Sequence, residues 1–162
     1  MKINTYTLTI ILLMFVLPIL SVANEVIAGS DTHLLLLIGK WFVFWGIGVR
    51  LLTAGIRQVL KPDLTSDGIL GIKGKEAWQL VRELGFANIG IGLIGFLSLN
   101  IAGWSFAAGL AGGLFLLFAG IEHVRKKNRN SEETLAMVSD LIVGLIGLSY
   151  AFAGIIHYIG WN

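Results

Sequence analysis

The chain contains no cysteine. This excludes disulfide bonds, thiolate metal ligands, iron–sulfur clusters and thiol redox chemistry supplied by the chain itself. Charge is also scarce, because Asp, Glu, Lys and Arg make up only 14% of the 162 residues. With 56% hydrophobic residues and a mean hydropathy of +0.81, the sequence is too apolar for an ordinary soluble domain and is typical of a protein that lies in a bilayer.

Five stretches are apolar enough to be considered as membrane spans, and one of them is ambiguous. A transmembrane helix needs about 20 mostly apolar residues. The four clear stretches are Leu34 to Leu60, Leu80 to Ile101, Phe106 to His123 and Leu135 to Tyr158. The ambiguous stretch, Leu8 to Ala23, is either a retained first span or the core of a cleaved signal peptide, because small residues end it as they end a signal peptide. Its length favours the retained span.

These stretches predict an all-α fold, an integral membrane helical bundle of four core transmembrane helices with an N-terminal hydrophobic segment. Residues 1–24 form that segment, and residues 33–162 form the four-helix transmembrane domain. Between the second and third spans, Ile69 to Ile72 lies either on the membrane surface or in a loop packed on the bundle. Asn130, followed three residues later by Glu133, resembles a capping pair for the last helix.

Lys and Arg residues lie in alternate connections, which predicts an orientation because these residues stay on the cytoplasmic side. Residues 24–33 contain no Lys or Arg, whereas residues 61–75 contain three and residues 125–129 contain four. We therefore expect a multi-pass protein of the cell membrane with the Lys2 end in the cytoplasm and the Asn162 end outside. The same topology explains the net charge of +2, so we expect no nucleic-acid partner.

Several short motifs are better explained by helix packing than by chemistry. Gly90 to Gly95 matches a dinucleotide-binding fingerprint, but that motif works between a strand and a helix and here lies inside a span. Small residues that let helices approach closely explain it better, as they explain Gly109 and Gly113, and such faces favour a homo-oligomer. Glu122 and His123 are adjacent and point about 100° apart on a helix. We therefore expect no catalytic motif, cofactor or metal site.

Polar side chains inside the spans are where we look for a function, because a charge at the centre of a span costs about 2.5 to 3.5 kcal/mol. The spacing of Arg50, Arg57 and Gln58 places all three on one face of the second span. We expect one of these arginines to pair with Glu83 or Asp140, since an unpaired buried charge would cost more than a pair. The predicted intramembrane polar cluster, in the cytoplasmic half, is Arg50, Arg57, Gln58, Glu83, Asn88, His123 and Asp140.

Four short motifs carry a resemblance to a known family. They are Gly48-Val-Arg50, Ala54-Gly-Ile-Arg-Gln58 with Pro62, Arg82-Glu-Leu-Gly-Phe-Ala-Asn88 and Ala119-Gly-Ile-Glu-His123. Between Trp41 and Asp140 the chain resembles a family of small prokaryotic multi-pass membrane proteins known only as a domain of unknown function. More loosely, the layout is similar to DoxX-like four-helix membrane proteins, some of which are linked to quinone or thiol chemistry. The absence of cysteine removes the thiol branch of that likeness, and the resemblance implies a membrane bundle without a reaction.

Three hypotheses for the function remain open. The favoured one is a non-enzymatic interaction or scaffold protein, in which the polar cluster only holds the bundle together. The second is a small transporter or proton-linked carrier with an inward-facing cavity. The third is a membrane enzyme accessory that acts on a lipid or a quinone. Membrane lipids are expected partners in each case, and the sequence does not name a small-molecule ligand.

Overall fold

The computed structural model describes residues 5–159, and within that range the chain consists of helices and short connections. Three of the segments are π-helical and are labelled η. In chain order the elements are α1 (Thr5–Ile11), η1 (Leu12–Val16), α2 (Leu17–Ile27), α3 (Leu34–Phe42), η2 (Val43–Val49), α4 (Arg50–Leu60), α5 (Asp63–Thr65), η3 (Ser66–Leu70), α6 (Lys75–Leu97), α7 (Trp104–Arg125) and α8 (Ser131–Ile159).

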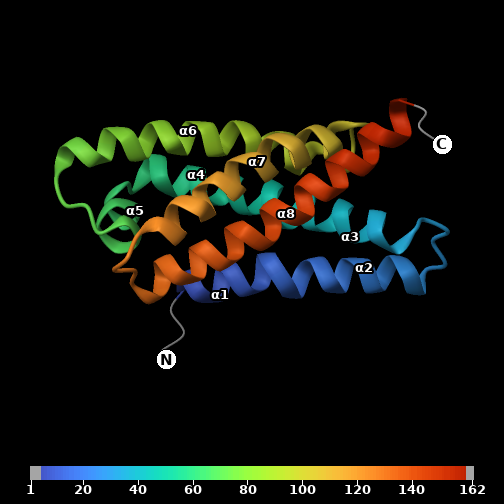
Figure 1. The fold of residues 1–162 in the computed structure, drawn as a ribbon, viewed down its shortest axis with the longest axis horizontal. Coiled ribbons are helices and arrows are strands. Elements are labelled where there is room, and N and C mark those ends of the chain that lie inside the picture. The colour runs from blue at the N-terminus through green and yellow to red at the C-terminus, as the bar shows by residue number, and fades with distance from the viewer. Residues whose placement is uncertain (1–4, 160–162) are drawn as a thin grey trace.

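Joined end to end, these elements form five long helices, each long and apolar enough to cross a membrane (Figure 1). The predicted all-α bundle of four core helices with an N-terminal hydrophobic segment is therefore confirmed. The first helix, Thr5–Ile27, runs beside the others, and its Met14 is fully buried against them. The second, Leu34–Leu60, has the predicted bounds.

The last three long helices start or end a few residues away from their predicted limits. Helix α6 starts at Lys75, five residues before the apolar stretch, because polar residues continue the helix beyond it. It ends before Ser98, whose hydroxyl donates to the Gly95 carbonyl at 2.6 Å. Helix α8 starts after Asn130, which accepts a hydrogen bond from the Glu133 backbone N–H at 2.8 Å, so the predicted cap is present.

Glycines bring the helix backbones together in two pairs, α4 with α6 and α7 with α8. A Cβ atom added at Gly55 of α4 would lie 2.6 Å from the Gly85 carbonyl oxygen of α6. A Cβ atom at Gly109 of α7 would lie 2.8 Å from the Gly147 carbonyl oxygen of α8. Both distances are too short for any side chain, so the glycines serve close approach within one chain. Self-association through glycine-rich faces stays a prediction.

The π-helical segments η1 and η2 lie side by side in the first two long helices. A π turn holds one more residue than an α turn, so it rotates the residues that follow it around the helix axis. Helix η2 ends at Val49, directly before Arg50, and therefore helps to set the direction of the Arg50 side chain. Trp45 of η2 donates from Nε1 to the Ser21 hydroxyl of α2 at 3.0 Å, which joins the same two helices.

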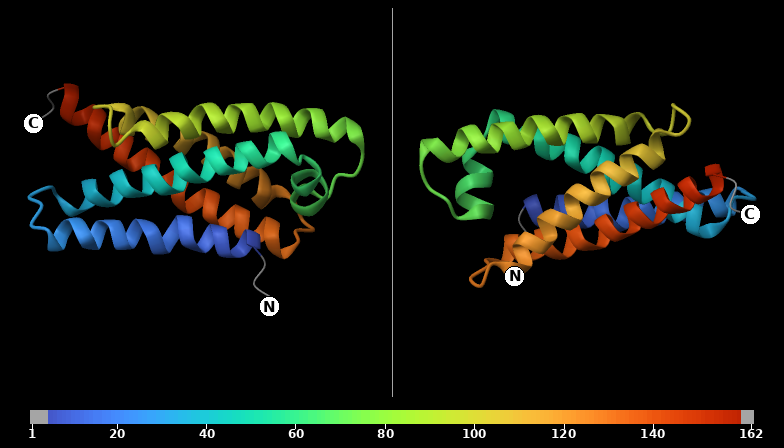
Figure 2. Two further views of the ribbon diagram at one scale, coloured as in Figure 1. Left: turned by 180° about the vertical axis from the view of Figure 1, so that it is seen from behind. Right: turned by 45° about the horizontal axis from the view of Figure 1, so that its top comes forward.

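The connections over residues 61–74 and 126–130 lie at one end of the bundle, which we call the basic end (Figure 1). The short α5–η3 segment folds back there, and Figure 2 shows it beside the start of α6. Thr65 and Ser66 are buried in this segment, so it packs on the bundle, one of the two predicted arrangements. Lys2 and Asn162, the two ends whose sides were predicted, lie outside the described residues.

Candidate functional site

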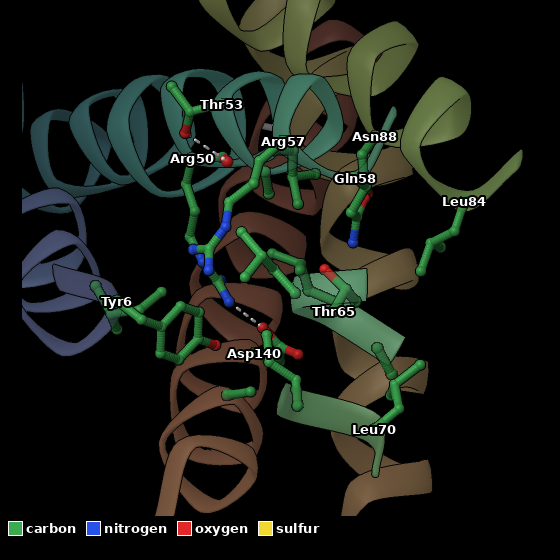
Figure 3. Close-up of a pocket in the computed structure, with 18 of the residues that line it drawn as sticks. Tyr6, Arg50, Thr53, Arg57, Gln58, Thr65, Leu70, Leu84, Asn88 and Asp140 are labelled. Carbon is green, nitrogen blue, oxygen red and sulfur yellow. Dashed lines mark hydrogen bonds and ion pairs between the residues drawn. The ribbon is translucent and has the colours of Figure 1, made fainter. Parts of the chain in front are cut away.

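A cavity of about 980 Å³ opens at the basic end of the bundle (Figure 3). All five long helices and the α5–η3 segment contribute to its wall, which is largely apolar with a polar group of residues on one side. Figure 2 shows α6 and α7 diverging toward this end, and both helices line the cavity. One representative from each contributing element is Tyr6, Arg50, Thr65, Asn88, Phe118 and Asp140.

A buried ion pair between Arg50 of α4 and Asp140 of α8 forms the centre of the polar side. The two residues are only 8% and 6% exposed. Arg50 donates through Nη2 to the Asp140 carboxylate and to the Ser139 hydroxyl, the latter at 3.1 Å. The other terminal nitrogen of Arg50, Nη1, is buried and has no hydrogen-bond partner among the described residues. This is one of the pairings expected from the sequence.

A second buried contact joins Gln58 of α4 to Asn88 of α6. The Asn88 side-chain nitrogen donates to Gln58 Oε1 at 2.7 Å, and both residues line the cavity. Asn88 is only 4% exposed, and its side-chain oxygen is buried without a hydrogen-bond partner among the residues that the structure describes. A lining residue in the middle of a helix pair therefore keeps an unused acceptor.

Arg57 lies about two helical turns beyond Arg50, at the exposed rim of the cavity. Its guanidinium stands 6.0 Å from the centre of the Tyr6 ring of α1, near the outer limit of a cation–π contact. Figure 3 shows the side chains of Arg50 and Arg57 directed into the same space, with the Tyr6 hydroxyl on the side of Asp140. Two guanidinium groups thus face the polar region that holds the Asp140 carboxylate.

His123 lies at the edge of the cavity in a separate ionic group. Its Nδ1 is 3.1 Å from the Glu133 carboxylate, and the Lys126 ammonium is 2.9 Å from the same carboxylate. Glu133 is 1% exposed, so this group fastens the buried start of α8 to the end of α7. The sequence indicated Glu133 only as a capping residue, and nothing in its local pattern signals the buried ion pairs.

Glu83 does not join the other predicted residues. It is exposed on α6, accepts a hydrogen bond from Gln79 at 3.1 Å, and does not line the cavity. Asn88 is five residues further along the same helix, which turns the two side chains about 140° apart. Because Asn88 faces the cavity, Glu83 faces away from it.

Some polar residues that the sequence did not single out also matter here. Tyr6 and Thr65 line the cavity, but each lies outside the apolar stretches that the sequence predicts as spans. At the opposite end of the bundle, Lys40 pairs with Glu25 at 2.8 Å, and Trp41 donates to the same carboxylate at 2.6 Å. That second pair ties α2 to α3 and lies away from the cavity.

Within the described residues, no three acidic or histidine side chains come together in a way that could hold a metal ion. The cavity wall offers hydrogen-bond donors, three cationic side chains and an apolar surface. Such a site can bind an organic molecule and orient it, since ligand cavities typically combine apolar walls with a few placed polar groups.

No curated protein and no solved structure matches the chain. A family model, described as the family of unknown function DUF6790, matches residues 4–153, a range that includes every cavity residue named above. The chain therefore belongs to DUF6790, a family of unknown function.

Proposed function

We propose that this protein is a multi-pass protein of the cell membrane that binds an amphiphilic small molecule in the cavity at its basic end. The observation that carries the proposal is a cavity of about 980 Å³ whose wall combines buried apolar residues with Arg50 and Asn88. Each of these two residues has a buried side-chain atom, Nη1 or Oδ1, without a hydrogen-bond partner among the described residues. Leaving one buried polar atom unsatisfied costs about 1 to 3 kcal/mol. A small turn of either side chain toward a ligand in the cavity would supply the missing partner and recover that cost.

The shape of the cavity supports a ligand that reaches it from the bilayer. Phe118 of α7 lines the cavity and is nevertheless 61% exposed, so the wall continues onto the outer surface of the bundle. On the other side, Thr9 and Thr53 are exposed rim residues. A molecule with an apolar part could extend through such a side opening while its polar part stays near Arg50.

The packing beyond the cavity supports binding rather than a continuous channel. Val43, Ile47 and Val143 are fully buried and pack together in the core of the bundle, between α3–α4 and α8. An inward-facing carrier would have the same closed outer half, so a carrier remains the alternative role for the same site. In either role we propose that the basic end faces the cytoplasm, because it holds the Lys and Arg residues of the connections.

The first hydrophobic segment takes part in the proposed site. Tyr6, Thr9 and Ile10 line the cavity, and Met14 is fully buried against the other helices. Cleavage after Ala23 would remove this wall. We therefore include the segment in the functional protein as a fifth span.

The experiment that tests the proposal compares two variants that add the same bulk at different places. Ala54 lines the cavity, and Ala87 of α6 is exposed outside it. The wild-type protein, Ala54→Phe and Ala87→Phe are extracted in native lipid, and the small molecules that each retains are identified by mass spectrometry. We expect a defined amphiphile with the wild type and Ala87→Phe, and its loss with Ala54→Phe.

The scaffold hypothesis gives a different result in the same experiment. If the polar cluster only locks the bundle, all three proteins retain the same mixture of bulk lipids, and this would overturn the proposed binding function. A quinone or another chromophore bound specifically to the wild type would instead favour the enzyme-accessory hypothesis. The retained molecule thus separates the three roles.

A further inference from the structure

The charged groups that line the cavity contain more positive than available negative charge. Three lining residues are cationic, namely Arg50, Arg57 and Lys61. The two lining carboxylates are both already paired, Asp140 with Arg50 and Glu122 with an arginine that does not line the cavity. The positive charges of Arg57 and Lys61 are therefore not neutralised within the wall.

The side chains of Arg50 and Arg57 concentrate this excess positive charge in one part of the cavity. Figure 3 shows both guanidinium groups directed into the same space, and Arg50 is only 8% exposed. Two like charges near a low-dielectric wall repel each other more strongly than they would in water. A guanidinium presents its donors in a planar fork that matches a carboxylate or a phosphate. The unused Nη1 of Arg50 is one such donor.

The apolar part of the wall lies next to these donors. Ile10, Leu51 and Leu116 are buried and line the same cavity, which continues past the exposed Phe118. A free inorganic anion would contact the arginines and leave this apolar wall in contact with water. An anion at the end of an apolar chain would cover both surfaces.

We infer that the ligand is an anionic amphiphile, with an oxyanion of the carboxylate or phosphate type bound between Arg50 and Arg57 and an apolar chain along the wall toward Phe118. This inference rests on the proposed binding function and adds the chemical class of the ligand. Asp140 has a definite part in it, because its carboxylate competes with the ligand for Arg50.

Binding of defined probes to the purified full chain tests the inference. The probes are a long-chain fatty acid, a single-chain phosphate monoester lipid, a single-chain phosphocholine lipid and inorganic phosphate, each added to protein in nanodiscs of zwitterionic lipid. We expect the two anionic amphiphiles to bind, and their relative affinities to distinguish a carboxylate from a phosphate site. Free phosphate should bind at least about tenfold more weakly because it lacks the apolar chain. The phosphocholine lipid should bind more weakly by a similar factor, because its quaternary ammonium group cancels the charge of its phosphate and is repelled by the two arginines.

Three variants locate the site. Arg57→Gln removes an exposed cation and should weaken binding of the anionic amphiphile about tenfold, the effect of one charge-assisted hydrogen bond. Arg82→Gln removes another exposed arginine, which does not line the cavity, and should leave binding unchanged. Asp140→Asn should strengthen binding and increase the thermal stabilisation that the amphiphile produces, because both nitrogens of Arg50 become available. A purely structural ion pair would give no such gain.

The outcomes separate this inference from the proposed function. If the phosphocholine lipid binds as tightly as the anionic probes, or if Arg57→Gln and Asp140→Asn leave the affinities unchanged, the anionic class is wrong while amphiphile binding stands. If inorganic phosphate binds as tightly as the phosphate lipid, the apolar chain plays no part. If no amphiphile binds, and the native extract of the wild type matches that of Ala54→Phe, both the class and the binding function are wrong.

Discussion

The buried pair of Arg50 and Asp140 predicts a pattern of stabilities that a peripheral contact would not produce. Their side chains are 9% and 8% exposed, so water and salt screen them little. Replacing Asp140 with Asn leaves the arginine charge without its partner, and replacing Arg50 with Gln leaves the carboxylate alone. Each change should lower the free energy of unfolding by about 3 to 5 kcal/mol in protein free of ligand.

The double variant Arg50→Gln/Asp140→Asn should recover most of this loss. It removes both charges together, so no buried charge is left without its partner. Replacing a whole buried ion pair with uncharged groups of similar volume is often close to neutral. We therefore expect the double variant to be more stable than either single variant, although two residues have been changed.

Thermal unfolding in ligand-free detergent, followed by the fluorescence of the five tryptophans, measures these effects. For a chain of this length the single variants should lower Tm by on the order of 10 °C. Arg82→Gln is the control, because Arg82 is exposed on α6. Losses that simply add in the double variant would show that the two side chains do not depend on each other, and would refute the reasoning.

The remaining predictions concern packing, topology and the first segment. Gly55→Ala should lower the free energy of unfolding by about 1 to 3 kcal/mol through overpacking, because its Cβ would lie 2.6 Å from a backbone oxygen of α6. A Cβ at Gly90 meets nothing within 4 Å, so Gly90→Ala is the control and should be neutral or stabilising. Thermal unfolding of both variants measures the difference. The chain has no cysteine, so single cysteines can be placed at Asn128 and Asn100, which lie at opposite ends of the bundle. A membrane-impermeant thiol reagent should label the first from the cytoplasmic side and the second from the outer side. Labelling of both from one side would contradict the topology. The intact mass of protein isolated from membranes should include residues 1–24, and a mass starting after Ala23 would show cleavage.

Hydropathy was sufficient to predict the five long helices because it depends on composition over many residues. The bounds Leu34–Leu60 could be read directly, since Pro62 and a polar cluster follow the apolar stretch. The shared direction of Arg50, Arg57 and Gln58 could also be predicted, because Arg50–Leu60 is a regular α-helix and obeys the spacing rule. All three residues line the cavity.

The parts of the site that could not be predicted depend on contacts between helices. The close approach of Gly55 in α4 to Gly85 in α6 decides which side of α6 faces the bundle, and therefore where Glu83 points. The sequence does not indicate which glycines come into contact. The π-helical segment η2 changes the helical register before Arg50, and a spacing rule based on α-helices does not detect it. Glu133 illustrates the same limit, since a capping position does not reveal what the side chain contacts.

The glycine contacts hold four of the helices as two tightly packed pairs, one made of α4 and α6 and the other of α7 and α8. The cavity lies between the two pairs at the basic end. Two hydrogen bonds join the connections of the two pairs at that end. Lys126 donates to the Leu70 carbonyl at 2.9 Å, and Asn130 donates to the Gly68 carbonyl at 3.0 Å. At the far end the turn over residues 98–103, where Gly103 has a φ of 79°, connects α6 of one pair to α7 of the other. Widening the cavity by moving the two helix pairs apart therefore requires these two hydrogen bonds to break, whereas the packing within each pair can stay unchanged.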